Sequence, residues 1–352
     1  MSLEQDLQER IVTAAAERTP LNIAAGNTKA FLGRSPQGER LDVSGLSGIL
    51  SYEPKELVIS ARAGTPLTEI EAALAEQGQM LPFEPPHFGT GATLGGTIAA
   101  GLSGPRRPYA GSARDFVLGA RILNGRGEIL RFGGEVMKNV AGYDISRLMV
   151  GAMGTLGVLL DVSLKVLPIP ASEITLVTDS DTATAINRFN ELAAKPVPLS
   201  AAACDGEHAY VRLSGAETAV DAASKILGGE QLDDSEDFWQ RRIREQEHAF
   251  FQGDTPLWRL SVPATSPGLA LQRKCLVDWG GALRWVKSDS SRDEIFHAVR
   301  EIGGHATLFR GGDRSDSVYQ PLPAPLMKIH KNLKQAFDPQ GLFNPGRLYE
   351  EL

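Results

Sequence analysis

The chain has 352 residues, of which 42% are hydrophobic and 22% charged, and its formal net charge is −7. This length exceeds one ordinary hydrophobic core and predicts two domains, and the composition is typical of a globular protein in water. The acidic balance argues against nucleic acid or an anionic lipid surface as the main partner, because both require a basic protein face.

The cysteines and the apolar runs set further limits. Cys204 and Cys275 are the only cysteines, so the chain cannot ligate an iron–sulfur cluster alone, and both are expected to be reduced thiols. The segment MSLEQDLQER lacks the apolar core of a signal peptide, and the longest apolar run, residues 148–160, is too short to span a bilayer. We therefore expect a cytoplasmic protein without direct membrane insertion, which would reach an inner membrane only through partner subunits.

The first half of the chain alternates helical and strand patterns. Helical spacing of apolar residues predicts helices that begin near residue 3 and at Thr65-Pro66. Apolar runs predict strands over residues 21–25, 57–63 and 157–167. Residues 116–123 and 128–132 form a predicted hairpin, with Asn124-Gly125 as a type I′ turn.

The second half is built differently, and the seam is expected near residues 167–170, where two prolines interrupt a strand pattern. Twenty-three of the 37 glycines precede residue 160, whereas all four tryptophans follow residue 200. Strands are predicted over 174–178, 199–204 and 209–213, and helices over 183–194, 217–227, 236–248, 292–302 and 324–337. The last helix is expected to bury Leu326, Ile329, Leu333 and Phe337. This order suits a ferredoxin-like helix-on-sheet unit, and no internal repeat is visible.

Residues 81–111, LPFEPPHFGTGATLGGTIAAGLSGPRRPYAG, contain very few large side chains. Glycine removes the Cβ that would hold a ligand away, and bare N–H groups can then bind anionic oxygens. The segment therefore predicts a cradle for an extended, phosphate-bearing cofactor. The spacing of Gly89, Gly91 and Gly95 does not match a Rossmann fingerprint, and residues 26–29 lack the P-loop pattern.

Two more glycine-containing segments have the same character. Residues 24–29 could bind a pyrophosphate, or form a tight turn that needs Gly and Asn for left-handed φ, and the pattern alone favours neither. The segments KNVAGYD, residues 138–144, and residues 151–158 read singly as a glycine-rich loop that leads into a strand.

As a set, these segments and the C-terminal FDPQGLFNPGR, residues 337–347, resemble the FAD-binding domain of the vanillyl-alcohol oxidase / p-cresol methylhydroxylase (PCMH) flavoprotein family. The resemblance implies an α+β fold. Residues 1–170 would form a two-subdomain PCMH-type FAD-binding domain, and residues 171–320 a small ferredoxin-like cap. Residues 321–352 would form a C-terminal helix and tail that return to the FAD domain.

The resemblance also implies which residues hold FAD. The pyrophosphate would lie between Gly26–Lys29 and the loop at Thr93, while the flavin side of the channel would be lined by Leu81, Pro82, Ser103 and Gly104. The full predicted set is Ala25, Gly26, Asn27, Thr28, Lys29, Leu81, Pro82, Thr93, Leu94, Gly95, Gly96, Ser103, Gly104, Ser112, Gly154, Gly157 and Val158.

Within the family, the chain length and the tail most resemble FAD-binding subunits of glycolate-oxidising complexes. That likeness implies oxidation of glycolate, a small 2-hydroxy acid, to glyoxylate through FAD. It also implies two partners, a second FAD-containing subunit and an iron–sulfur subunit. The alternatives are a stand-alone FAD oxidoreductase of another small alcohol or 2-hydroxy acid, and a structural subunit without catalysis. A UDP-sugar reductase is a more remote alternative function.

The catalytic residues are less well defined. Many 2-hydroxy-acid dehydrogenases of the family carry a His-x-x-x-Gly-Asn-x-His metal motif, but residues 303–310 read GGHATLFR, and no metal is expected. Oxidation of a 2-hydroxy acid needs a base and a cation for the carboxylate, for which His305 and Arg310 are the candidates. Pairing of Arg310 with Asp313 or Asp316 is the structural alternative. The first loop has no Cys or His for covalent flavin attachment.

Overall fold

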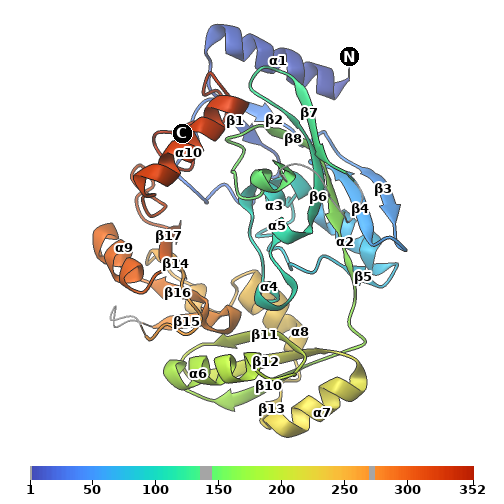
Figure 1. Cartoon of the computed structure of the whole chain (residues 1–352), viewed down its shortest axis with the longest axis vertical. Coiled ribbons are helices and arrows are strands. Elements are labelled where there is room, and N and C mark those ends of the chain that lie inside the picture. Colours follow the sequence, from blue (N-terminus) through green and yellow to red (C-terminus); the bar gives the residue numbers. More distant parts are fainter. Residues whose placement is uncertain (1, 135–144, 269–273) are drawn as a thin grey trace.

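The computed structural model describes residues 2–134, 145–268 and 274–352 (Figure 1). We call residues 2–168 the first part, residues 172–310 the second part and residues 324–352 the tail. The predicted KNVAGYD segment, residues 138–144, lies outside the described residues.

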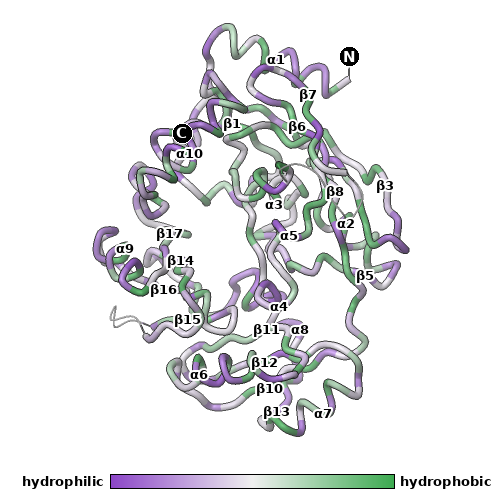
Figure 2. The backbone as a smooth tube through the Cα atoms, viewed as in Figure 1, coloured by the Kyte–Doolittle hydropathy of each residue, from purple (hydrophilic) through white to green (hydrophobic). Residues whose placement is uncertain are grey.

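A five-stranded antiparallel sheet forms the centre of the first part, with the strand order β3-β4-β8-β6-β7. Figure 2 shows that β6 and β8 are hydrophobic along most of their length, whereas α1 is mostly hydrophilic. The predicted strands and hairpin are confirmed, and the bounds are β3 Ile49–Glu53, β4 Val58–Arg62, β6 Val117–Leu123, β7 Ile129–Gly133 and β8 Val158–Lys165.

The turn of that hairpin differs from the prediction. Neither Asn124 nor Gly125 has positive φ, so the turn is not type I′. Gly127 takes the left-handed conformation instead, with φ 73°. The Asn124 Oδ1 accepts hydrogen bonds from the N–H groups of Arg126 and Glu128, at 2.9 Å each, and this side-chain contact selects the longer loop.

Helices cover this sheet and join its strands. α1 (Leu3–Glu17) starts from a capping box between Ser2 and Gln5, and α2 (Leu67–Ala75) buries Leu67, Ile70 and Leu74, as its periodicity predicts. The remaining elements are β1 Leu21–Ala24 parallel to β2 Glu39–Asp42, β5 Gln79–Met80 paired with β9 Leu167–Pro168, α3 Leu94–Ala100, α4 Arg107–Ala110, α5 Ala113–Phe116 and the 3₁₀ helix Ile145–Met149.

An eight-stranded antiparallel sheet organises the second part, with the order β13-β10-β12-β11-β15-β16-β14-β17. When the strands of each half are numbered along the chain, β10–β13 lie in the order 4-1-3-2. β14–β17 lie in the order 2-3-1-4, which is the same order read backwards, and the two halves meet where β11 pairs with β15. The bounds are β10 Ser172–Asp179, β11 Leu199–Cys204, β12 His208–Gly215, β13 Glu230–Gln231, β14 Leu257–Ser261, β15 Cys275–Asp278, β16 Leu283–Lys287 and β17 His305–Arg310. The sheet thus repeats one four-stranded topology, a repetition that no repeat in the sequence indicates.

Three α-helices of the second part follow their predicted ranges closely: α6 Thr182–Ala193, α7 Glu217–Leu227 and α9 Arg292–Glu301. The helix predicted over 236–248 does not form as an α-helix. After α8 (Ser235–Asp237), residues Phe238–Arg244 form a π-helix, and the 3₁₀ helices Ala249–Phe251 and Trp279–Gly281 complete the part. Tertiary contacts override local propensity here, because Trp239 Nε1 donates to Thr175 Oγ1 at 2.7 Å.

The tail begins with α10 (Ala324–Phe337) and then runs beside β1. Leu326 and Ile329 are 46% and 53% exposed, so half of the predicted apolar face is not buried. The buried residue of the helix is Lys334 instead, whose Nζ donates to the carbonyl groups of Thr155 and Phe343. A buried ion pair and its hydrogen bonds thus fix the helix where apolar packing was expected.

Candidate functional site

A cavity of about 170 Å³ lies where the two glycine-containing loops of the first part meet. Residues 22–30 form one wall, and Gly91, Thr93 and Gly96 form the opposite wall. Ala99, Ala100, Met153, Pro36 and the tail residues Asn344 and Arg347 also line it. We call this cavity the cradle. It brings together segments that lie more than sixty residues apart in the sequence.

The first loop of the cradle offers a row of free donors. Among the described residues, none accepts a hydrogen bond from the backbone N–H groups of residues 26–29. Asn27 has φ 57°, the left-handed conformation that Asn tolerates. Successive N–H groups in such a turn form a concave site for an anion.

Lys29 adds a cation at the same place. Its side chain is buried, and Nζ donates to the His87 carbonyl at 3.1 Å and to Thr28 Oγ1 at 3.4 Å. Burial lowers the pKa of Lys29 to about 8, against the opposing influence of Glu245. The ammonium group is therefore mostly protonated at neutral pH, and a nearby anion would raise its pKa further.

The second loop enters α3 through Thr93. The Thr93 Oγ1 accepts from the Gly96 N–H at 3.2 Å, whereas the Leu94 and Gly95 N–H groups donate to carbonyl oxygens of Thr65 and Ala63. Thr93 and Gly96 therefore line the cradle, while Leu94 and Gly95 fix the loop to the rest of the first part.

Glycine is required where the two loops touch. A Cβ built on Gly26 would overlap the Gly91 carbonyl oxygen and would lie 2.6 Å from its carbonyl carbon. The backbones thus approach each other as closely as glycine permits.

The tail closes the cradle from the third side. Asn344 Oδ1 accepts from the Ile23 N–H at 2.8 Å, and its Nδ2 donates to the Met153 carbonyl at 2.6 Å. Arg347 donates to the Ala30 carbonyl at 2.7 Å. Sequence reasoning did not name Asn344 or Arg347 as cavity residues, although the FDPQGLFNPGR segment that contains them was singled out.

The other predicted cofactor residues lie in several places. Gly154, with φ 73°, faces the Asn344 amide, and a Cβ there would lie 2.7 Å from Nδ2. Leu81 borders a separate, acidic groove, whereas Ser103 and Gly104 line a second cavity between the two parts. Three of the predicted residues have a structural role instead: Ser112 forms a capping box with Asp115, Gly157 approaches the Leu123 carbonyl, and Val158 is fully buried in β8. Pro82 does not line the cradle, the acidic groove or the second cavity.

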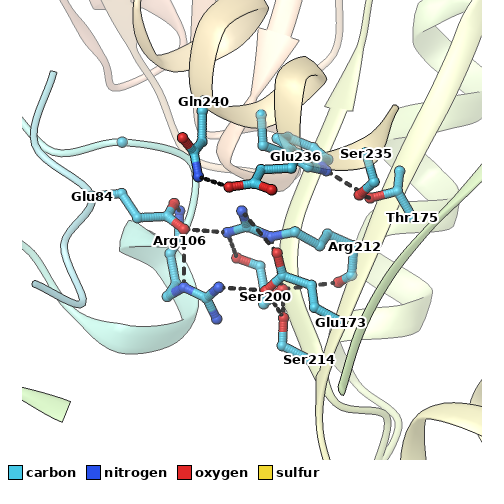
Figure 3. A network of polar contacts seen from close by, with 12 residues as sticks. Glu84, Arg106, Glu173, Thr175, Ser200, Arg212, Ser214, Ser235, Glu236 and Gln240 are labelled. Atoms are coloured by element: carbon cyan, nitrogen blue, oxygen red, sulfur yellow. Dashed lines mark hydrogen bonds and ion pairs between the residues drawn. The ribbon is translucent and has the colours of Figure 1, made fainter. Parts of the chain in front are cut away.

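A charged network joins the second loop to the second part (Figure 3). Arg106 Nε and Arg212 reach the same Glu84 oxygen at 3.1 and 2.8 Å, and Arg106 also pairs with Glu173 at 2.6 Å. Burial alone would raise the pKa of Glu173, but Arg212, Ser214 and Arg106 lower it below its usual value. Two cations and two anions thus balance at the junction and hold the second loop against the sheet.

The two candidate catalytic residues do not come together. His305 and Arg310 occupy opposite ends of β17, about 16 Å apart along an extended strand. The Arg310 guanidinium lies 4.9 Å from the Phe31 ring centre, and Arg292, not Arg310, pairs with Asp316. Burial, with the nearby charge of Arg259, lowers the pKa of His305. In the described part of the chain, no group of three His, Cys, Asp or Glu side chains is arranged to hold a metal ion.

Comparison with known proteins agrees with this geometry. The model of an FAD binding domain family matches residues 2–133. The chain is 51% identical to glycolate oxidase subunit GlcE of Escherichia coli K12, over 99% of this chain and 98% of that protein. It is 30% identical to glycolate oxidase subunit GlcD of Bacillus subtilis 168, over 97% and 86% of the two chains.

A solved structure of alkyldihydroxyacetonephosphate synthase has the same fold, with a TM-score of 0.66 at 13% identity over 97% of this chain and 74% of that one. The fold, the cradle and these relatives define an FAD-dependent oxidoreductase of the FAD-linked oxidase class. Within that class, the chain belongs to the family of glycolate oxidase subunit GlcE.

The residues present fit the pyrophosphate of FAD. Four N–H groups without an acceptor among the described residues, a glycine cradle and a buried lysine form a site for an anion with little side-chain bulk. The cradle is smaller than the 300–1,000 Å³ of typical ligand pockets, so it accounts for the pyrophosphate section of the cofactor rather than its whole length. Among the described residues, no helix is both long and apolar enough to cross a bilayer.

Proposed function

We propose that this chain is the FAD-binding subunit of an enzyme that oxidises glycolate to glyoxylate. The observation that carries the proposal is the row of free N–H groups at residues 26–29, which faces the second loop across a glycine contact. The related GlcE and GlcD proteins, which are named as glycolate oxidase subunits, support the substrate class.

In this proposal the two loops bind and orient the cofactor. Asn27, Thr28 and Lys29 hold the pyrophosphate from one side and Thr93 and Gly96 from the other. When bound, FAD accepts the two electrons of the 2-hydroxy acid, while the chain supplies position, charge and exclusion of water. Asn344 and Arg347 keep the cradle closed by tying the tail to β1 and the first loop.

We further propose the division into an FAD-binding domain over residues 1–170, a cap over 171–320 and a returning tail over 321–352. The connectivity of β10–β13, with α6 and α7 between strands, supports a ferredoxin-like cap half. The hydrogen bonds between Leu21 and residues 342 and 344 support the returning tail. We expect the chain to act in the cytoplasm.

Two partners belong to the proposal, a second FAD-containing subunit and an iron–sulfur subunit. With Cys204 buried and Cys275 partly so, the chain has no cluster of its own to pass electrons onward. A relay or structural role beside a catalytic neighbour is the second candidate. It is favoured by the separation of His305 from Arg310 and by the missing His-x-x-x-Gly-Asn-x-His motif.

The absorption spectrum of the purified full chain tests the proposal. Yellow protein that glycolate bleaches supports independent oxidation, and yellow protein that reacts only with its partners present supports the relay. Colourless protein that takes up no added FAD, yet restores activity of the complex, would leave only the structural role.

A further inference from the structure

A second cavity, of about 30 Å³, lies between the first and second parts and shares no lining residue with the cradle. Ser103 and Gly104 of the second loop form one side of it. Gln246, Arg259 and Asp278 of the second part form the other. Phe88, Trp285 and Phe309 supply apolar walls. We call it the junction cavity.

Three unusual backbone features meet around the junction cavity. The π-helix ends at Arg244, and the next residue but one, Gln246, has φ 62°. Trp279, beside the cavity residue Asp278, has φ 55° although it is bulky. π-Helices and left-handed non-glycine residues cost free energy and cluster at functional sites.

Polar groups in the cavity wall lack partners. Gln246 is 4% exposed, and its Oε1 is buried with no hydrogen-bond partner among the described residues. Asp278 is 3% exposed; its Oδ1 accepts from the Trp279 N–H at 2.7 Å, while no described residue donates to Oδ2. A buried acceptor without a donor is rare in native proteins, so Gln246 Oε1 is suited to a ligand that donates, and Asp278 Oδ2 can accept a hydrogen bond as well.

A cation without a carboxylate partner stands beside these acceptors. The Arg259 guanidinium lies 4.9 Å from the Trp279 ring centre, and Arg107 lies 4.3 Å from the same ring. In the part of the chain that the structure describes, neither guanidinium forms an ion pair within 4 Å; Asp115 is the carboxylate whose charge acts on Arg107, and Asp278 is the one whose charge acts on Arg259. Among the residues that line the cavity, Asp278 is the one carboxylate and Arg244 and Arg259 are the cations, and Arg244 already pairs with Glu245 at 3.2 Å.

We propose that the junction cavity binds a small 2-hydroxy monocarboxylate, with Arg259 pairing with its carboxylate and with the 2-hydroxyl donating its one hydrogen bond to Asp278 or Gln246. The inference rests on the proposed function and names the residues that select its substrate. A guanidinium provides the donors for a carboxylate, and the two acceptors discriminate for a hydroxyl.

Asp278 is also suited to the chemistry of the bound hydroxyl. Burial raises its pKa to about 7, while the charges of Arg212 and Arg259 act in the opposite direction and Glu84 adds to the rise. A carboxyl group that titrates near neutral pH can accept a hydroxyl proton and return it. Tyr109 faces the same group, and Asp278 contributes to the raised pKa of its phenol.

Equilibrium binding of glycolate to the full chain tests this site. The titration follows tryptophan fluorescence under anaerobic conditions with the flavin reduced beforehand, so that no turnover occurs. Wild type is expected to bind glycolate about 10-fold more tightly than acetate, which lacks the hydroxyl. Arg259→Gln should weaken glycolate binding by about 10- to 100-fold, and Asp278→Asn should reduce the preference for glycolate over acetate to about twofold.

The matched control is Arg300→Gln, an exposed arginine of α9, which should bind glycolate as wild type does. Arg259→Lys keeps the charge and provides a second variant if Arg259→Gln fails to fold, with an intermediate loss expected. Equal glycolate affinity in wild type and the folded Arg259 variants, or no measurable glycolate binding to wild type, would overturn the site.

The same titration on chain without added FAD separates this inference from the proposed function. Because Arg259 lies outside the cradle, its substitution should leave the ratio of flavin to protein unchanged. A chain that takes up no FAD refutes the proposed function, while the comparison of Arg259 variants still decides the cavity.

Discussion

Replacement of Gly26 by alanine should separate cofactor binding from folding. The added Cβ would lie 2.6 Å from the Gly91 carbonyl carbon, whereas ordinary contact begins at 3.4 Å, so the two loops must move apart by 0.8 Å or more. Because the loops hold the pyrophosphate from opposite sides, such a shift removes about two charge-assisted hydrogen bonds. At about 1.5–3 kcal/mol each, the loss is about 3–6 kcal/mol, or roughly 10²- to 10⁴-fold in FAD affinity.

Quenching of FAD fluorescence on titration with protein measures this affinity. The matched control is Gly268→Ala in the second part, where a Cβ would meet no atom of the described residues within 4 Å. The control should bind FAD as wild type does, and both variants should keep the wild-type circular dichroism spectrum. If Gly26→Ala folds and binds FAD with wild-type affinity, the cradle is not the pyrophosphate site and the reasoning fails.

Three further predictions concern buried charges. Lys334→Met leaves the fully buried Asp338 carboxylate without its cation, so urea denaturation should show a loss of about 3–5 kcal/mol in the free energy of unfolding. The pKa of Asp278 is raised from 3.8 to about 7 in the folded protein, so ionisation of this carboxyl destabilises the fold as the pH rises from about 4 to above 7. At pH 8 the Asp278→Asn variant should therefore be more stable than wild type by on the order of 4 kcal/mol. At pH 4 the two proteins should be equally stable. Lys29 has a pKa lowered to about 8, so wild-type FAD affinity should fall about tenfold between pH 7 and pH 9.5, and a Lys29→Met variant that titrates identically would contradict its role.

The local sequence predicted most of the first part because its signals are short-range. Apolar residues at helical spacing predicted α2, and the structure confirms it. The errors arose where distant contacts decide the outcome. Trp239 bonds to Thr175 on another element, and no pattern within residues 236–248 reveals the π-helix that results.

The candidate site divides in the same way. The composition of residues 26–29 left a pyrophosphate loop and a tight turn equally open, and only the resemblance to the FAD-binding family implied that they face the second loop across a cofactor site. Sequence alone cannot show that a side chain lacks a hydrogen-bond partner or an opposite charge in the folded chain. Gln246 falls within a predicted helix and Arg259 within no predicted element, and only the positions of their neighbours show that an acceptor and a cation lack counterparts.

The hydrogen bond between Ile23 and Asn344 spans 321 positions of the chain, and it has a consequence for biosynthesis. During translation the first loop leaves the ribosome long before Asn344 and Arg347, so the wall that they form cannot exist while most of the protein is being made. Contacts of such long sequence separation form late and slow folding. Nascent chains should therefore capture the dinucleotide only after nearly all of the polypeptide has emerged.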